Sequence, residues 1–157
     1  MLINVKECYK VRIIKRSYIR TLAKVLVRLI KMMLDYIDRI NSYGDHIVRL
    51  YNFDRLQAVK FREAIRETLI LNKKQLELAT TDFIQRRNCN LTLRISTEDI
   101  GISTSDKKNF FCDLTISRYE QMISLLGPFC EKETKGYQYL YDIDSSTDFL
   151  FSPGGTW

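Results

Sequence analysis

The sequence offers few side chains that could do catalysis. His46 is the single histidine among 157 residues, and no recognisable signature places a serine or cysteine beside it. The chain has no glycine-rich phosphate loop, no His-Glu-x-x-His zinc motif and no Gly-x-Ser-x-Gly nucleophile turn. We therefore expect a protein that is not an enzyme, with His46 in a structural or surface role. Carboxylates that meet from distant positions are an alternative that the sequence leaves open.

The nearest approach to a metal-binding motif lies in residues 142–148, Asp-Ile-Asp-Ser-Ser-Thr-Asp. Asp142, Asp144, Ser146 and Asp148 fall at positions 1, 3, 5 and 7 of a calcium loop, but the positions that require glycine and glutamate hold threonine and proline. We expect an acidic hairpin turn here, and neither a metal ion nor a cofactor.

The same aspartates have aromatic neighbours and no basic ones. No lysine or arginine follows Lys135. Tyrosines occupy alternate positions just before Asp142, at Tyr137, Tyr139 and Tyr141. Carboxylates steer a basic partner, and tyrosines supply contact area at low entropic cost. The residues expected to contact a protein partner are Asp142, Asp144, Asp148, Tyr139 and Tyr141. In the plainer interpretation the tyrosines cover the core and the carboxylates are solvated.

A second candidate surface lies in the N-terminal part of the chain. Apolar residues recur at alternating spacings of three and four from Ile19 to Ile40, which predicts an amphipathic helix over Tyr18–Ile40. Its opposite face would carry Arg16, Arg20, Lys24, Arg28 and Lys31. Docking on the chain's own domain, self-association, and binding to an anionic membrane surface or to RNA all remain open for this helix.

The charge divides the chain into two parts. Residues 1–40 hold ten Lys/Arg and three acids, a net charge of +7, and residues 41–157 hold 15 Lys/Arg and 16 acids, a net charge of −1. We therefore expect a basic helical appendage over 1–40 and a single domain over 41–157. Met32 and Met33 leave open a translation start at that point.

The domain is expected to be α+β, a mostly antiparallel sheet of about five or six short strands covered by two helices. Asp54 and Gln57 form a capping-box pattern at the start of the first helix, and Ser117–Glu120 does so at the second, which Gly127-Pro128 would end or kink. Residues 97–109 read as a long exposed connection. The expected strands are 46–51, 89–96 and 110–115, with short candidates at 76–78 and 81–84 and a C-terminal hairpin over 137–144 and 149–151.

Cysteine usage and hydropathy suggest a location. The four cysteines are widely spaced and form no metal or redox motif, so we expect reduced thiols and a cytoplasmic protein. Lysine and arginine interrupt the N-terminal apolar residues at every turn, which argues against a signal peptide and a membrane-spanning helix.

From Asp45 onward, the exposed acids and the missing catalytic set resemble the small immunity proteins of bacterial toxin systems. The resemblance covers roughly the last 110 residues and rests on size and on the arrangement of elements. It implies a protein that binds a cognate toxin and blocks it through the acidic, tyrosine-rich surface. The alternative is a peripheral adaptor that binds an anionic membrane or RNA through the basic helix.

Overall fold

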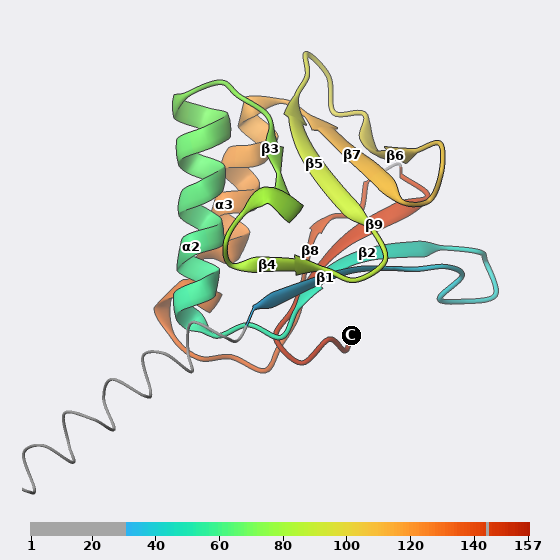
Figure 1. Cartoon of the computed structure of the whole chain (residues 1–157), viewed down its shortest axis with the longest axis horizontal. Coiled ribbons are helices and arrows are strands. Elements are labelled where there is room, and N and C mark those ends of the chain that lie inside the picture. Colours follow the sequence, from blue (N-terminus) through green and yellow to red (C-terminus); the bar gives the residue numbers. More distant parts are fainter. Residues whose placement is uncertain (1–30, 144) are drawn as a thin grey trace, which may run out of the picture. The chain divides into compact units, whose positions relative to one another are not determined.

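Two helices and two mixed β-sheets make up the part of the chain that the computed structural model describes, residues 31–143 and 145–157. The chain divides into two units, Met1–Ile30 and Lys31–Trp157, and the fold described here is that of the second. It is an α+β fold, as the sequence predicts (Figure 1).

The larger sheet has five strands in the order β4-β1-β2-β9-β8. Pairing is antiparallel between β1 and β2 and between β8 and β9, and parallel between β1 and β4 and between β2 and β9. The strands are β1 (Met32–Ile37), β2 (His46–Tyr51), β4 (Ile84–Arg86), β8 (Gln138–Tyr141) and β9 (Thr147–Ser152).

The smaller sheet has four strands in the order β3-β5-β7-β6. Its central pair, β5 and β7, is parallel, and both outer pairs are antiparallel. The strands are β3 (Leu76–Glu77), β5 (Asn90–Ile95), β6 (Gly101–Thr104) and β7 (Asn109–Leu114). The expected single, mostly antiparallel sheet is therefore wrong, because parallel pairs join strands that are distant in the chain and leave no mark on the local pattern.

The first helix begins where the sequence predicts. Asp54 caps α2 (Arg55–Ile65): its carboxylate accepts from the Gln57 backbone N–H at 2.8 Å, and the Gln57 side chain accepts from the Asp54 N–H at 3.0 Å. The helix continues as the π-helical segment η1 (Arg66–Leu71), and a 3-10 turn, η2 (Leu78–Thr80), follows β3. Ala58, Phe61, Ile65 and Leu69, which recur at the spacing of one helical face, are fully buried.

The second helix, α3 (Ile116–Glu131), differs from its prediction at both ends. Thr115 caps it in place of Ser117, since the Thr115 hydroxyl accepts from the Arg118 N–H at 3.2 Å. The helix continues past Pro128 and ends at Glu131. Pro128 lies in the last turn, where a proline removes one backbone hydrogen bond and little of the helix remains to be broken.

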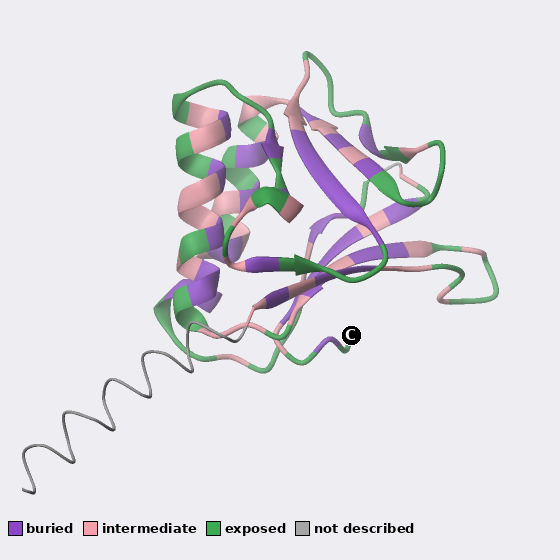
Figure 2. Cartoon of the chain, in the orientation of Figure 1, coloured by how far each residue is buried: buried purple, intermediate pink, exposed green. Residues whose placement is uncertain are grey.

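The two sheets and the two helices share one hydrophobic core. Buried residues run through both sheets and along one side of the helices (Figure 2). Phe151 of β9 lies at the centre of an aromatic cluster, stacked on Phe53 with ring centroids 4.0 Å apart and on Phe61 at 5.7 Å, and in edge contact with Phe129 at 5.0 Å. The core thus joins elements from most of the described sequence.

The helix expected over Tyr18–Ile40 is wrong in its last part. Residues 18–30 lie outside the described residues, but Met32–Ile37 forms β1, which pairs with β2 on one side and β4 on the other. Met32 and Leu34 are fully buried on either side of the half-buried Met33, which is the alternation of a strand, whereas the helical spacing assigned Met33 and Tyr36 to the apolar face. Because β1 pairs with β2 on one edge and with β4 on the other, these residues follow the two-residue period of a strand and not the 3.6-residue period of a helix. The strand therefore belongs to the folded unit that begins at Lys31.

The exposed connection expected over residues 97–109 contains β6, which pairs with β7. Gly101 begins this strand with a positive φ of 88°, and a Cβ atom there would come within 2.8 Å of the Tyr141 ring. Glycine therefore allows β6 to pass close to the C-terminal hairpin. A four-residue strand with three small or polar residues around one buried isoleucine, Ile102, gives little sequence signal.

Three of the four cysteines lie in the described part of the chain, where Cys89, Cys112 and Cys130 are buried and free. Burial raises the pKa of the Cys89 and Cys112 thiols to about 12, so both are protonated at neutral pH. Cys89 and Cys112 belong to the hydrophobic core, where they pack as small hydrophobic residues. Within residues 31–143 and 145–157, no helix has the length and apolar character needed to cross a membrane.

Candidate functional site

The C-terminal hairpin brings Asp142 and Asp148 together, and the parallel pairing of β2 with β9 places a third acid, Asp45, near them. Asp142 follows β8, Asp148 lies in β9 opposite Ile47 of β2, and Asp45 directly precedes β2. Burial raises the pKa of Asp148, and the negative charges of Asp142 and Asp45 raise it further. No ion pair found among the described residues includes any of the three carboxylates.

Tyr139 and Tyr137 lie beside these acids. Burial raises the pKa of the half-buried Tyr139, and the charge of Asp148 adds to this effect. The rings of Tyr137 and Tyr139 meet edge to face with centroids 5.9 Å apart, and Tyr137 is 50% exposed. We call Asp45, Asp142, Asp148, Tyr137 and Tyr139 the acidic face.

Of the residues predicted for this surface, one is buried and another lies outside the described residues. Tyr141 is only 4% exposed, because an irregularity in the β8–β9 register between Tyr139 and Tyr141 leaves Leu140 and Tyr141 both buried. The alternation expected from the sequence would have placed Tyr141 beside Tyr139, so its assignment to the surface is corrected. Asp144 lies outside the described residues.

Most of the predicted basic surface also lies outside the described residues, namely Arg16, Arg20, Lys24 and Arg28. Lys31 is described and half-buried, and it directly precedes β1. Its carbonyl accepts a hydrogen bond from the Asn52 side chain at 3.4 Å. A position at the start of a strand differs from the helical position expected for Lys31.

His46 belongs to a polar cluster that joins the two sheets. Its Nδ1 lies 2.8 Å from an oxygen of Asp38, whose other oxygen accepts from Lys107 at 3.1 Å. The Arg39 N–H also points at Nδ1, at 3.2 Å, but one nitrogen cannot accept from Arg39 and donate to Asp38 at once. The hydrogen bond from Lys107 is the largest influence that lowers the pKa of Asp38.

The surroundings of His46 do not assemble a nucleophile. An open hollow of about 380 Å³ lies beside it, lined also by Ser103, Thr104 and Ser146. Ser146 contacts His46 through its carbonyl, which accepts from the His46 backbone N–H at 3.2 Å. In the described parts of the chain, no hydroxyl or thiol is hydrogen-bonded to the His46 ring, so the contact that activates a nucleophile is missing.

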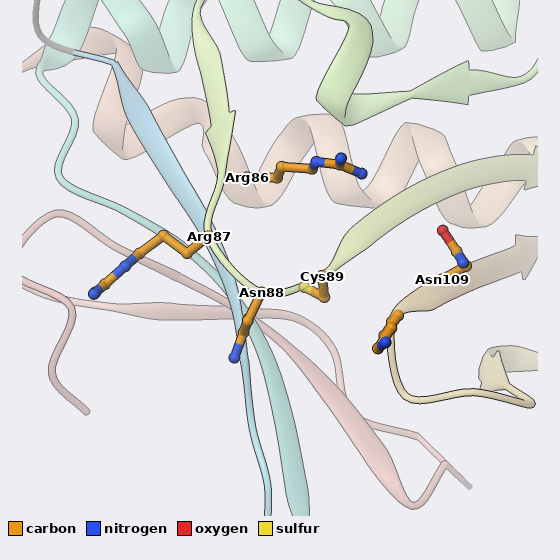
Figure 3. A pocket seen from close by; sticks show the side chains of 6 residues that line it. Arg86, Arg87, Asn88, Cys89 and Asn109 are labelled. Carbon is orange, nitrogen blue, oxygen red and sulfur yellow. The ribbon is translucent and has the colours of Figure 1, made fainter.

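A basic hollow was not foreseen from the sequence. Its volume is about 300 Å³, and Arg86, Arg87, Asn88, Cys89, Lys108 and Asn109 line it (Figure 3). Two polar segments about 20 residues apart supply these residues, and the parallel pairing of β5 with β7 brings the segments together. In the sequence, the dipeptide Arg86-Arg87 is only a weak sign of a basic site. The β5–β7 pairing is needed to bring Lys108 and Asn109 near it.

Comparison with known proteins places the chain in no family. No family model matches it, and no curated protein does so. The assignment of function therefore depends on the geometry of these surfaces.

Proposed function

We propose that Lys31–Trp157 is a non-catalytic protein-binding domain that binds a basic protein partner through its acidic face. The immunity-protein resemblance implies that the partner is a toxin and that binding blocks it. The observation that carries the proposal is that Asp45, Asp142 and Asp148 lie together beside Tyr139, with no ion pair to any of the three carboxylates among the described residues.

The acidic face has the composition of a contact surface. Its acids come from the end of β8, from β9 and from the residue before β2, so a sheet holds them in place. Tyr137 adds an exposed ring, and Ile143 next to Asp142 is 45% exposed. Aromatic and apolar groups provide the buried centre of a protein interface, and the surrounding carboxylates select a positively charged partner.

The test compares an Asp142→Asn/Asp148→Asn variant with the wild-type chain as bait in affinity capture from the native organism. A protein held through the acidic face is retained by the wild type and lost with the variant. With the purified partner, we expect affinity to fall at least about tenfold in the variant and to fall with added salt in the wild type. If the partner is a toxin, the wild-type chain also blocks its activity.

Asp82→Asn is the matched control. Asp82 is exposed and precedes β4, which is the edge strand opposite β8 in the five-stranded sheet. This variant makes the same chemical change on a different part of the surface, so partner binding is expected to be unchanged. A partner that binds the double variant as tightly as the wild type would show that the acidic face is not the binding surface.

A further inference from the structure

The basic hollow lies where the chain passes from the five-stranded sheet to the four-stranded one. Arg86 ends β4, Cys89 directly precedes β5, and Lys108 and Asn109 stand at the start of β7. Because β4 and β8 are opposite edges of the larger sheet, this hollow is separate from the acidic face.

Hydrogen bonds hold the walls of the hollow in place. The Asn90 N–H donates to the Lys108 carbonyl at 2.7 Å, which ties the two segments together. The Asn88 side chain exchanges two hydrogen bonds with the Tyr36 backbone, at 2.8 and 2.9 Å, and the Arg87 N–H donates to the Leu34 carbonyl at 2.8 Å. A ligand that enters this hollow meets a surface that is already formed, so little ordering opposes binding.

The charges in the hollow are positive and unpaired with acids. Five other arginines form ion pairs with carboxylates, but in the described part of the chain neither Arg86 nor Lys108 does so. Two acids near the hollow are already engaged: Asp35 holds Arg49 through both oxygens, and Asp106 accepts from the Asn109 side chain and from the backbone N–H groups of Lys108 and Asn109.

Two neighbouring arginines point in different directions. Figure 3 shows the Arg86 side chain reaching over Cys89 toward Asn109, whereas Arg87 extends away from this space. The Arg87 guanidinium donates instead to the Tyr51 hydroxyl at 2.8 Å. Arg86 and Lys108 are therefore the cations available to a ligand in the hollow.

From this geometry we propose that the hollow binds the phosphate group of a phosphomonoester. A guanidinium fork and an ammonium group match phosphate oxygens, and two cations in one place suit a dianion better than the single charge of a diester. The hollow is open and has no aromatic lining residue, so it takes the phosphate and leaves the rest of the ligand outside.

The test is an NMR titration of the full chain with methyl phosphate at constant ionic strength. The amide signals of Asn88, Cys89 and Asn109 are expected to shift and saturate. Arg86→Gln and Lys108→Gln, both at exposed positions, are expected to weaken binding about fivefold to tenfold. Arg87→Gln is the matched control, since it removes the same charge from a side chain that points away, and it is expected to change affinity less than about twofold.

Two further probes decide the ligand class. Dimethyl phosphate is expected to bind at least about fivefold more weakly than methyl phosphate, and inorganic phosphate separates binding of the free ion from binding of an ester. Equal affinities for the monoester and the diester would overturn the dianion preference. No saturable shift, or equal losses in Arg86→Gln and Arg87→Gln, would overturn the site.

Discussion

At the scale of single residues, Asp148 is placed where its charge destabilises the fold. Burial and the neighbouring Asp142 and Asp45 raise its pKa above the ordinary value of 3.8. The folded state therefore binds this proton more tightly than the unfolded state, and stability falls as the pH rises from that value through the folded-state pKa. Such a cost is common at binding surfaces, where the arrangement of charge serves a partner.

Replacing Asp148 by asparagine is therefore expected to stabilise the protein. Near pH 7 the gain in the free energy of unfolding should be below about 1 kcal/mol, because the group is partly solvated. At about pH 2.5 the difference from wild type should vanish, since Asp148 is then protonated in both states. Denaturant unfolding at the two pH values measures this. A variant less stable than wild type at neutral pH would contradict the like-charge explanation.

At the scale of elements, a buried tyrosine hydroxyl links α3 to the smaller sheet. The fully buried Tyr119 hydroxyl lies 2.7 Å from the Cys112 carbonyl of β7 and 3.0 Å from the Arg94 carbonyl of β5. It shares its proton between the two parallel strands. Arg94 and Asp113 pair across the same strands through two hydrogen bonds of 2.7 and 2.6 Å.

Tyr119→Phe is expected to lower the free energy of unfolding by about 1 kcal/mol, because the phenyl ring fills the same space but removes the buried hydrogen bonding of the hydroxyl to the Cys112 and Arg94 carbonyls. Tyr137→Phe serves as the control: its ring is half-exposed, and its change should stay within about 0.5 kcal/mol. Chemical denaturation followed by circular dichroism distinguishes the two variants. Equal effects would mean that the Tyr119 hydroxyl does not hold α3 to the sheet.

Elements with strong local signals could be predicted, and their partners could not. Asp54 and Gln57 predict the start of α2, because the capping box that they form is complete within four residues. The strand β2 matches its predicted bounds, since its sequence is rich in β-branched and aromatic residues. By contrast, Arg94 pairs with Asp113 because β5 and β7 are parallel neighbours in the sheet, although β6 lies between them in the sequence. No local sequence pattern contains that information.

The same reasoning explains the mixed outcome for the candidate surfaces. Asp142, Asp148 and Tyr139 lie close together because a predictable hairpin carries them all. Asp45 joins them only through the parallel pairing of β2 with β9, which sequence spacing cannot show. The register irregularity that leaves Tyr141 buried could not be predicted either, because the alternation of tyrosines with other residues favours a regular strand.

At the scale of the whole molecule, the charge division remains after the boundary moves from residue 41 to Lys31. Residues 1–30 hold eight Lys/Arg and one acid, and residues 31–157 hold 17 Lys/Arg and 18 acids. The positive charge of the chain thus belongs to its N-terminal segment, and the near-neutral remainder carries separate acidic and basic surfaces. The adaptor alternative concerns that segment and stays a prediction, since Arg16, Arg20, Lys24 and Arg28 lie outside the described residues.

The new boundary predicts opposite outcomes for two truncations. A chain of residues 31–157 keeps β1 and is expected to unfold cooperatively, with a free energy close to that of the full chain. A chain of residues 41–157 loses β1, the strand between β4 and β2, together with the buried Met32 and Leu34, and is expected not to fold.

Several kcal/mol of apolar burial disappear with β1, and Arg49 loses its bidentate partner Asp35, so the remaining sheet is left with a gap in its middle. Circular dichroism and urea unfolding of both chains provide the measurement. If residues 41–157 were as stable as the longer chain, β1 would not be a structural strand. If residues 31–157 failed to fold, the N-terminal segment would have to contribute to the stability of the domain.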